Sequence, residues 1–193
     1  MIDQVLDFLC RQVNAYLLTK LDPSPESAIV LFNVSQLGTN AEGADDTKNA
    51  FLTLVNVEED RISKSQQNYV RRDEKLIYQQ PKVHVNLYLL FSANLDYLES
   101  LKRISLIIQF FQHRNVFTPL TTPALPIGVD ELVLDLYTTS FQELNNLWGV
   151  LGSRYLPSVM YKMRMVTISE DMDQGEAGLI TSIVITEQNT ESW

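Results

Sequence analysis

Residues 81–112 constrain the fold most strongly, because their hydrophobic period changes part-way along the stretch. In the first half, apolar and polar residues alternate, which is typical of a strand whose successive side chains point to opposite faces. In the second half, apolar residues recur at helical spacing: Leu98, Leu101, Ile104, Ile108 and Phe111. Neighbouring apolar residues widen this stripe, so the helix needs cover on more than one side. We expect a sheet beneath it and a second helix or another subunit above it.

The alternation in the predicted strand separates an apolar face from a polar one. The apolar face carries Val83, Val85, Leu87, Leu89 and Phe91. The polar face carries Lys82, His84, Asn86 and Tyr88. One face is therefore expected to contact the core and the other to contact solvent or a partner.

The composition indicates a single acidic globular domain. The chain has 193 residues, of which 45% are hydrophobic and 20% are charged, so it is long enough to bury one large core. Its formal net charge of −9 disfavours binding to the phosphate backbone of nucleic acids. No shift in composition marks a domain boundary, so residues 1–193 are expected to form one domain.

The sequence shows no sign of secretion or direct membrane insertion. The first residues include Asp3 and Asp7 and lack the basic and apolar regions of a signal peptide. The longest apolar candidate, residues 104–111, is shorter than the roughly 18 residues that cross a membrane. We expect a chain that is made in the cytoplasm.

Periodicity predicts the remaining elements along the chain. Further strands are expected at residues 28–34, 51–62, 131–137, 158–168 and 179–186, and further helices at residues 2–20 and 140–152. Residues 63–80 are predicted to form a hairpin extension or a flexible connection, and residues 170–178 an acidic turn. Together these elements predict an α+β fold, with a mixed or mainly antiparallel sheet of about six strands and about three helices packed on one face.

The predicted helix at residues 140–152 has the clearest boundaries. Ser140 and Glu143 match a capping box, and Gly152 is placed to form a C-terminal glycine cap. Its expected buried stripe is Phe141, Leu144, Trp148 and Leu151.

Side chains with catalytic potential are few and scattered. His84 and His113 have no neighbours at metal-ligand spacing, and Cys10 has no local histidine to activate it, so Cys10 is expected to be a small buried side chain. Glu58 and Glu59 could act as an acid/base pair in a small hydrolase, but solvated charges at a strand end are the plainer interpretation. We therefore predict no enzyme activity, no metal and no cofactor.

Lys162 and Arg164 are the more informative charges. They alternate with apolar residues on the strand predicted at 158–168, so they stand together on one sheet face of an acidic protein. Either an acidic partner or solvent could meet them there.

Two stretches resemble a known family. They are PKVHVNLYLLFSANLDYLESLKRISLIIQFFQHRNVFTP at 81–119 and SFQELNNLWGVLGSRYLPSVMYKMRMVTI at 140–168. Both are similar to the cap, or tail-terminator, family of bacterial extracellular contractile injection systems, which are phage-tail-like particles. The segments NLYLLFSAN and ELNNLWGVLG are its most specific parts, and the similarity extends over essentially the whole chain.

The resemblance implies a structural role and a single tail-terminator-like cap domain. Members of this family form a hexameric ring on the end of the inner tube that lies away from the baseplate. The ring stops tube and sheath growth and keeps the sheath attached to the tube. The implied partners are other copies of the chain, the inner tube protein and the sheath protein, in a particle that can be released from the cell.

We derive two contact hypotheses from this resemblance. The strand predicted at residues 179–186 is expected to lie at a sheet edge and pair with a strand of the sheath, through Leu179, Thr181, Ile183 and Ile185. His84, Asn86, Lys162 and Arg164 are expected on a ring surface that faces the tube or a neighbouring subunit. Three alternative functions stay open: another component of the same kind of particle, such as a tube initiator or a neck protein; a small hydrolase; and a monomeric adaptor.

Overall fold

The computed structural model describes residues 1–21, 27–37, 48–60, 69–72, 75–78, 84–167 and 176–178. Its three α-helices are α1 (Ile2–Leu18), α2 (Tyr97–His113) and α3 (Phe141–Leu151). A short 3-10 helix spans Val34–Gln36. The strand predicted at residues 179–186 lies outside the described residues.

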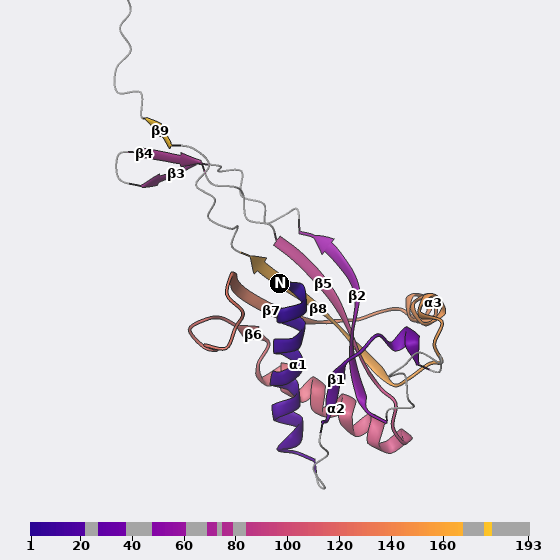
Figure 1. The fold of residues 1–193 in the computed structure, drawn as a ribbon. Coiled ribbons are helices and arrows are strands. Elements are labelled where there is room, and N and C mark those ends of the chain that lie inside the picture. The colour runs from indigo at the N-terminus through magenta and orange to yellow at the C-terminus, as the bar shows by residue number, and fades with distance from the viewer. Residues whose placement is uncertain are drawn as a thin grey trace, which may run out of the picture.

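A six-stranded sheet forms the centre of the molecule (Figure 1). Its strands are, in order across the sheet, β1 (Ile29–Leu31), β2 (Ala50–Glu59), β5 (His84–Ala93), β8 (Ser158–Thr167), β7 (Val129–Tyr137) and β6 (Val116–Phe117). The β1–β2 pair is parallel and every other neighbouring pair is antiparallel. The predicted α+β class and the mixed sheet are thereby confirmed.

A second, smaller sheet has the order β3 (Tyr69–Arg72), β4 (Lys75–Tyr78) and β9 (Glu176–Gly178). β3 and β4 form a hairpin, which confirms the first of the two alternatives for residues 63–80. The acidic turn predicted at residues 170–178 is wrong at its end, because β9 pairs antiparallel with β4 there. In Figure 1 this sheet lies beyond one end of the main sheet.

The helices cover both faces of the main sheet, so the prediction that they share one face is wrong for α3. α1 and α2 pack on the face that carries Leu87, Leu89 and Phe91. The opposite face carries Leu90 and Met160, and Trp148 of α3 packs with them. Central strands that are apolar on both faces need cover on both sides.

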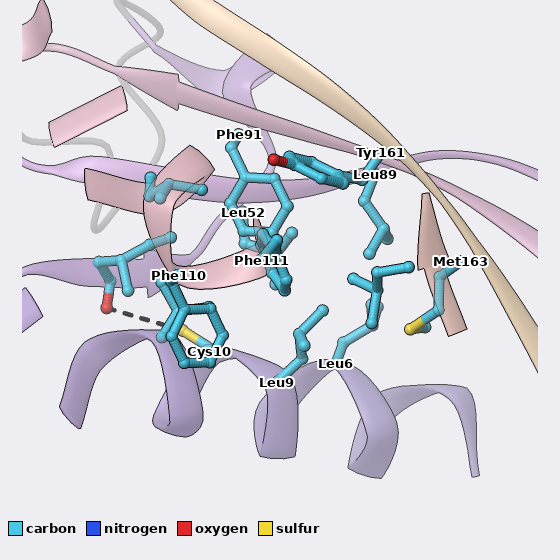
Figure 2. Close-up of a cluster of buried hydrophobic side chains, with 14 of the residues drawn as sticks. Leu6, Leu9, Cys10, Leu52, Leu89, Phe91, Phe110, Phe111, Tyr161 and Met163 are labelled. Atoms are coloured by element: carbon cyan, nitrogen blue, oxygen red, sulfur yellow. Dashed lines mark hydrogen bonds between the residues drawn. The ribbon is translucent and has the colours of Figure 1, made fainter. Parts of the chain in front are cut away.

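The main core lies between α1, α2 and the sheet, as Figure 2 shows. Leu9 of α1 and Leu89 of β5 are fully buried. The ring centroid of Phe111 in α2 lies 5.4 Å from that of Phe91 and 4.6 Å from that of Tyr161. Such ring contacts contribute about 0.5–1.5 kcal/mol each beyond the area that they bury.

Cys10 is buried in this core, as predicted. Its Sγ atom lies 3.6 Å from the backbone oxygen of Ile29, to which it donates a weak hydrogen bond. Burial, with a smaller contribution from the charge of Asp7, raises the pKa of the thiol to about 11. The side chain is therefore a protonated packing group at neutral pH.

The predicted stripe of α2 is wrong at its N-terminal end. Leu98 and Leu101 are 78% and 39% exposed, whereas Ile107 is completely buried. The buried residues of α2 are Ser100, Arg103, Ile104, Ile107, Phe110 and Phe111. The first turns of α2 therefore present apolar side chains outward, while the later turns pack on the core.

This difference predicts unequal effects of truncation along α2. Ile107→Ala should lower the free energy of unfolding by about 2–5 kcal/mol, because it leaves a cavity in a packed core. Leu98→Ala is the matched control and should change that free energy by no more than about 0.5 kcal/mol. Urea unfolding of the two variants measures both values, and equal losses would contradict the placement of α2.

Candidate interaction surface

A polar surface occupies the α3 side of the sheet, where the strands run past the helix. Strand register places Asn86 of β5 opposite both Glu58 of β2 and Arg164 of β8. In the adjacent row, Lys162 lies between Tyr88 and Asp135. We call this surface the polar sheet face; its residues are Glu58, His84, Asn86, Tyr88, Asp135, Lys162 and Arg164.

The structure thus brings together the four strand residues predicted to meet a partner. His84, Asn86, Lys162 and Arg164 occupy neighbouring positions on two paired strands and share one face. Their contact role stays a prediction. The other four predicted contact residues, Leu179, Thr181, Ile183 and Ile185, lie outside the described part of the chain.

Tyr88 organises the centre of the polar sheet face. Its hydroxyl donates a 2.7 Å hydrogen bond to Oε2 of Glu58, and its ring lies edge-on to that of Tyr137 at 5.2 Å. The Lys162 ammonium stands over the Tyr88 ring, 5.5 Å from its centroid. The hydrogen bond to the Glu58 carboxylate, with some desolvation, raises the pKa of Tyr88 to about 12. These contacts hold one negative and one positive group at fixed places on the surface.

Arg164 forms the second polar contact on this surface. Its Nη2 donates to Oδ2 of Asp135 at 3.3 Å, and the two side chains are 53% and 54% exposed. An ion pair this exposed contributes at most about 1 kcal/mol to stability. It can therefore rearrange at little cost when a partner approaches.

Asn86 differs from its neighbours because its side chain is buried. It is 4% exposed, and its Oδ1 atom accepts no hydrogen bond from the described residues. An unsatisfied buried acceptor costs about 1–3 kcal/mol. Asn86 is therefore a buried polar group beneath this surface, and its Oδ1 atom is not exposed to a partner.

A groove of about 360 Å³ runs between the polar sheet face and α3. It is lined by Val55, Asn56, Glu58, Tyr88, Tyr137, Thr139, Glu143, Leu147 and Met160. Aromatic and aliphatic groups line most of the groove, and two carboxylates lie among them. This lining suits an extended segment that carries both apolar and basic side chains.

The two carboxylates in the groove are already engaged. Glu58 accepts the hydroxyl hydrogen of Tyr88, and Glu143 accepts from the backbone N–H of Ser140 at 2.7 Å. The hydrogen bonds from Ser140 hold the pKa of Glu143 below its usual value. Both groups act as hydrogen-bond acceptors, and the lowered pKa of Glu143 is the opposite of the raised pKa that a general acid needs.

Ser140 and Glu143 form the predicted capping box, and Gly152 has the left-handed conformation (φ 64°) of the predicted helix end. The expected buried stripe of α3 is wrong at Phe141, which is 93% exposed. Among the described residues of α3, only Trp148 is buried. Phe141 at the start of α3 is therefore exposed, while Trp148 further along the helix packs on the sheet.

His84 lies at the edge of the polar sheet face, beside a small hollow. This hollow measures about 60 Å³ and is lined by Asp60, His84, Val85, Glu131, Val133, Arg164 and Met165.

The described residues contain no group of three or more histidine, cysteine or acidic side chains that could hold a metal ion. No helix in the described part of the chain is long and apolar enough to cross a membrane.

Sequence reasoning missed the apolar residues that the fold leaves uncovered. Leu120 and Ile127, between β6 and β7, are 95% and 99% exposed, and Tyr97 of α2 is 69% exposed. Leu120 and Ile127 lie in a segment that also carries prolines at positions 119, 123 and 126. Periodicity could not reveal which apolar residues of that segment face outward.

Comparison with protein families decides the relationship. A family model described as the Pvc16 N-terminal domain matches residues 4–182. The chain belongs to the Pvc16 N-terminal domain family. This membership confirms the family that the sequence resembles.

Two solved structures share the fold of this family member. The sheath/tube terminator of an extracellular contractile injection system, PVC, in its extended state, superposes with a TM-score of 0.65 at 17% identity. That match covers 100% of this chain and 65% of the other. The anti-feeding prophage cap, a tube-terminating cap, superposes with a TM-score of 0.63 at 13% identity, covering 96% of this chain and 60% of the other.

The chain therefore spans less than two thirds of the length of the two terminators whose fold it shares. At these identities the likeness shows the fold alone. No curated protein matches the chain.

The Tyr88–Glu58 contact predicts a change in tyrosine titration. A raised folded-state pKa adds stability below the ordinary tyrosine value near 10, and this stability is lost as the pH rises toward about 12. Glu58→Gln should move the pKa of Tyr88 down toward 10, because the carboxylate charge is gone. The measurement is the tyrosinate absorbance during a pH titration of the wild-type chain and of Glu58→Gln. Subtracting the absorbance of the matching chain that also carries Tyr88→Phe leaves the titration of Tyr88 alone.

Tyr161 is an internal control for that titration. Burial raises its pKa to about 12, and Glu58 contributes nothing to that shift. The Tyr161 titration should stay in place in Glu58→Gln. An unchanged Tyr88 titration in Glu58→Gln would contradict the hydrogen bond.

Proposed function

We propose that this chain is a structural cap, or tail terminator, that ends polymerisation of the inner tube and sheath of a contractile injection particle. The observation that carries the proposal is the family match over residues 4–182, with a fold shared with two terminators. We also propose that the chain has no enzymatic role, since both groove carboxylates serve as structural acceptors.

The surface of the single chain supports a role in assembly. Several apolar side chains stand exposed on separate elements: Tyr97, Leu98, Leu120, Ile127, Phe141 and Val150. Exposed apolar groups in such number favour contacts with other subunits. We propose that copies of the chain form a ring, a hexamer in the family pattern, which assembles in the cytoplasm on the tube end.

We propose that the polar sheet face contacts the tube or a neighbouring subunit in that ring. Lys162 and Arg164 supply positive charge on an acidic protein, and Glu58 and Asp135 supply negative charge on the same face. Fixed charges of both signs favour one orientation of a partner over others, because misaligned like charges repel. Such selectivity is what a protein needs in order to bind only the end of a tube.

Particles made without this chain test the proposed function. If the chain is a terminator, electron microscopy should show tubes that are overlong or variable in length, with sheaths that detach. Restoring the chain should restore uniform length. Absent tubes would instead indicate a tube initiator, and particles of normal length and attachment would contradict the proposal.

Charge reversal tests the polar sheet face separately. Lys162→Glu with Arg164→Glu should weaken ring or tube attachment at least about tenfold, because it replaces the two positive charges proposed to meet the partner with negative ones. The matched control is Arg11→Glu with Lys102→Glu, which changes the net charge equally on the exposed surfaces of α1 and α2. Co-sedimentation with tubes measures attachment, and equal behaviour of the two variants would remove this surface from the contact.

A further inference from the structure

None of the described strands covers the outer edge of β2 along about half of its length. β2 pairs with β5 from Ala50 to Glu59, but β1 pairs only with Ala50, Phe51 and Leu52. Beyond that point, the backbone N–H of Phe32 donates to the oxygen of Leu52 at 3.0 Å, and the chain then turns into the 3-10 helix. In the described part of the chain, no strand lies beside residues 54–59 on this edge.

Hydrogen bonds at the two ends of β2 show which backbone groups face this edge. The Leu52 oxygen accepts from Phe32 and so points outward, whereas the N–H of Asp60 donates inward to His84 at 2.8 Å. Backbone groups alternate in direction along an antiparallel strand. The register of β2 against β5 shifts between Leu54 and Asn56, so the alternation is followed separately from each end of β2. On this basis, the N–H and C=O groups of Leu54 and of Val57 point outward.

A groove lies on each side of this open edge. The α1-side groove measures about 460 Å³ and is lined by Ile2, Asp3, Leu6, Leu31, Phe32, Asn33, Leu52, Thr53 and Leu54. The α3-side groove, described above, includes Val55, Asn56 and Glu58. A strand added to β2 would direct alternate side chains into the two grooves, because its side chains point to opposite faces.

β3 is a suitable strand for this edge, because it is itself an edge strand and carries positive charge. It is the outermost strand of the smaller sheet, and in the described residues only β4 pairs with it. Its sequence is Tyr-Val-Arg-Arg, which combines apolar groups with two positive charges. The α3-side groove offers an apolar lining with the carboxylates of Glu58 and Glu143. Opposite charges on two open edges favour their pairing.

We propose that the open edge of β2 receives β3 from a second copy of this chain. The contact joins two different parts of the molecule, so subunits associate head to tail, and a head-to-tail contact that closes on itself forms a ring. The inference rests on the proposed ring and names the contact that builds it. β2 and β3 of one copy are not paired with each other, so each copy offers one donor strand and one acceptor edge.

A two-variant cross-linking experiment tests this pairing in the full-length chain. Val57→Cys marks the acceptor edge, and Val70→Cys marks the donor strand in a separate preparation. Cys10 is buried and its pKa is raised to about 11, so the native thiol should resist maleimides at neutral pH. Mixing the two variants with a short bis-maleimide should give a covalent dimer at about tenfold or more the yield of either variant alone.

Two outcomes of that experiment would overturn the proposal. One is an equal yield from the mixture and from the single variants, which would indicate contact between like edges or random collision. The other is the absence of any mixed dimer while the same Val57→Cys edge cross-links to sheath protein in isolated particles. In that case the edge accepts a sheath strand.

Charge reversal on the donor adds a second, independent measurement. Arg71→Glu with Arg72→Glu in the Val70→Cys chain should lower the mixed cross-link about tenfold, because one of these two neighbouring positions would then bring a negative charge into the α3-side groove, beside Glu58 and Glu143. The control donor carries Arg11→Glu with Lys102→Glu and should retain the yield. An unchanged yield with reversed β3 charges would contradict the pairing.

The proposed function can fail separately from this inference. Particles with normal tube ends but no mixed cross-link would leave the terminator role intact and remove the β2–β3 contact. A strong mixed cross-link in particles whose tube length does not depend on this chain would support the β2–β3 contact and remove the terminator role.

Discussion

The antiparallel pairing of β5 with β8 is the interaction on which the rest of the structure depends. The two strands stay in register from His84 to Ser92, opposite Val166 to Ser158, in the middle of the main sheet. Their residues are apolar on both faces over the central part, with Leu89 and Tyr161 on one side and Leu90 and Met160 on the other. One side holds α1 and α2, and the other holds α3. Where the same two strands run beyond α3, their residues become polar and form the polar sheet face.

The elements that local chemistry determines could be predicted from the sequence. The change of period in residues 81–112 predicted β5 and α2, and Ser140 with Glu143 predicted the start of α3, because a strand period or a cap is written in neighbouring residues. What an apolar side chain meets depends on distant segments, and this explains the errors at Leu98 and Phe141. Both residues continue a helical stripe past the end of the surface that covers it. The grouping of His84, Asn86, Lys162 and Arg164 was predictable from alternation, but the Tyr88–Glu58 contact needed the β2–β5 register.

The single chain leaves three kinds of surface incomplete. Apolar side chains on α2, α3 and the segment before β7 face outward, Asn86 carries an acceptor that no described residue satisfies, and β2 has an edge that no described strand covers. Contact with another protein can cover the apolar side chains and the strand edge, whereas the Asn86 acceptor is buried and costs free energy within the fold. The exposed apolar side chains and the uncovered edge of β2 are the physical observations behind the proposal that this member of the Pvc16 N-terminal domain family works as part of an assembly.

Amide hydrogen exchange tests most directly whether assembly completes these surfaces. The N–H of Val57 faces the open edge of β2, whereas the N–H of Asp60 is bonded to β5 within the chain. The account predicts that peptides containing Val57 exchange rapidly in the free chain and at least about tenfold more slowly in assembled particles, with Asp60 protected in both. Equal exchange of the Val57 amide in the free and assembled states would contradict it.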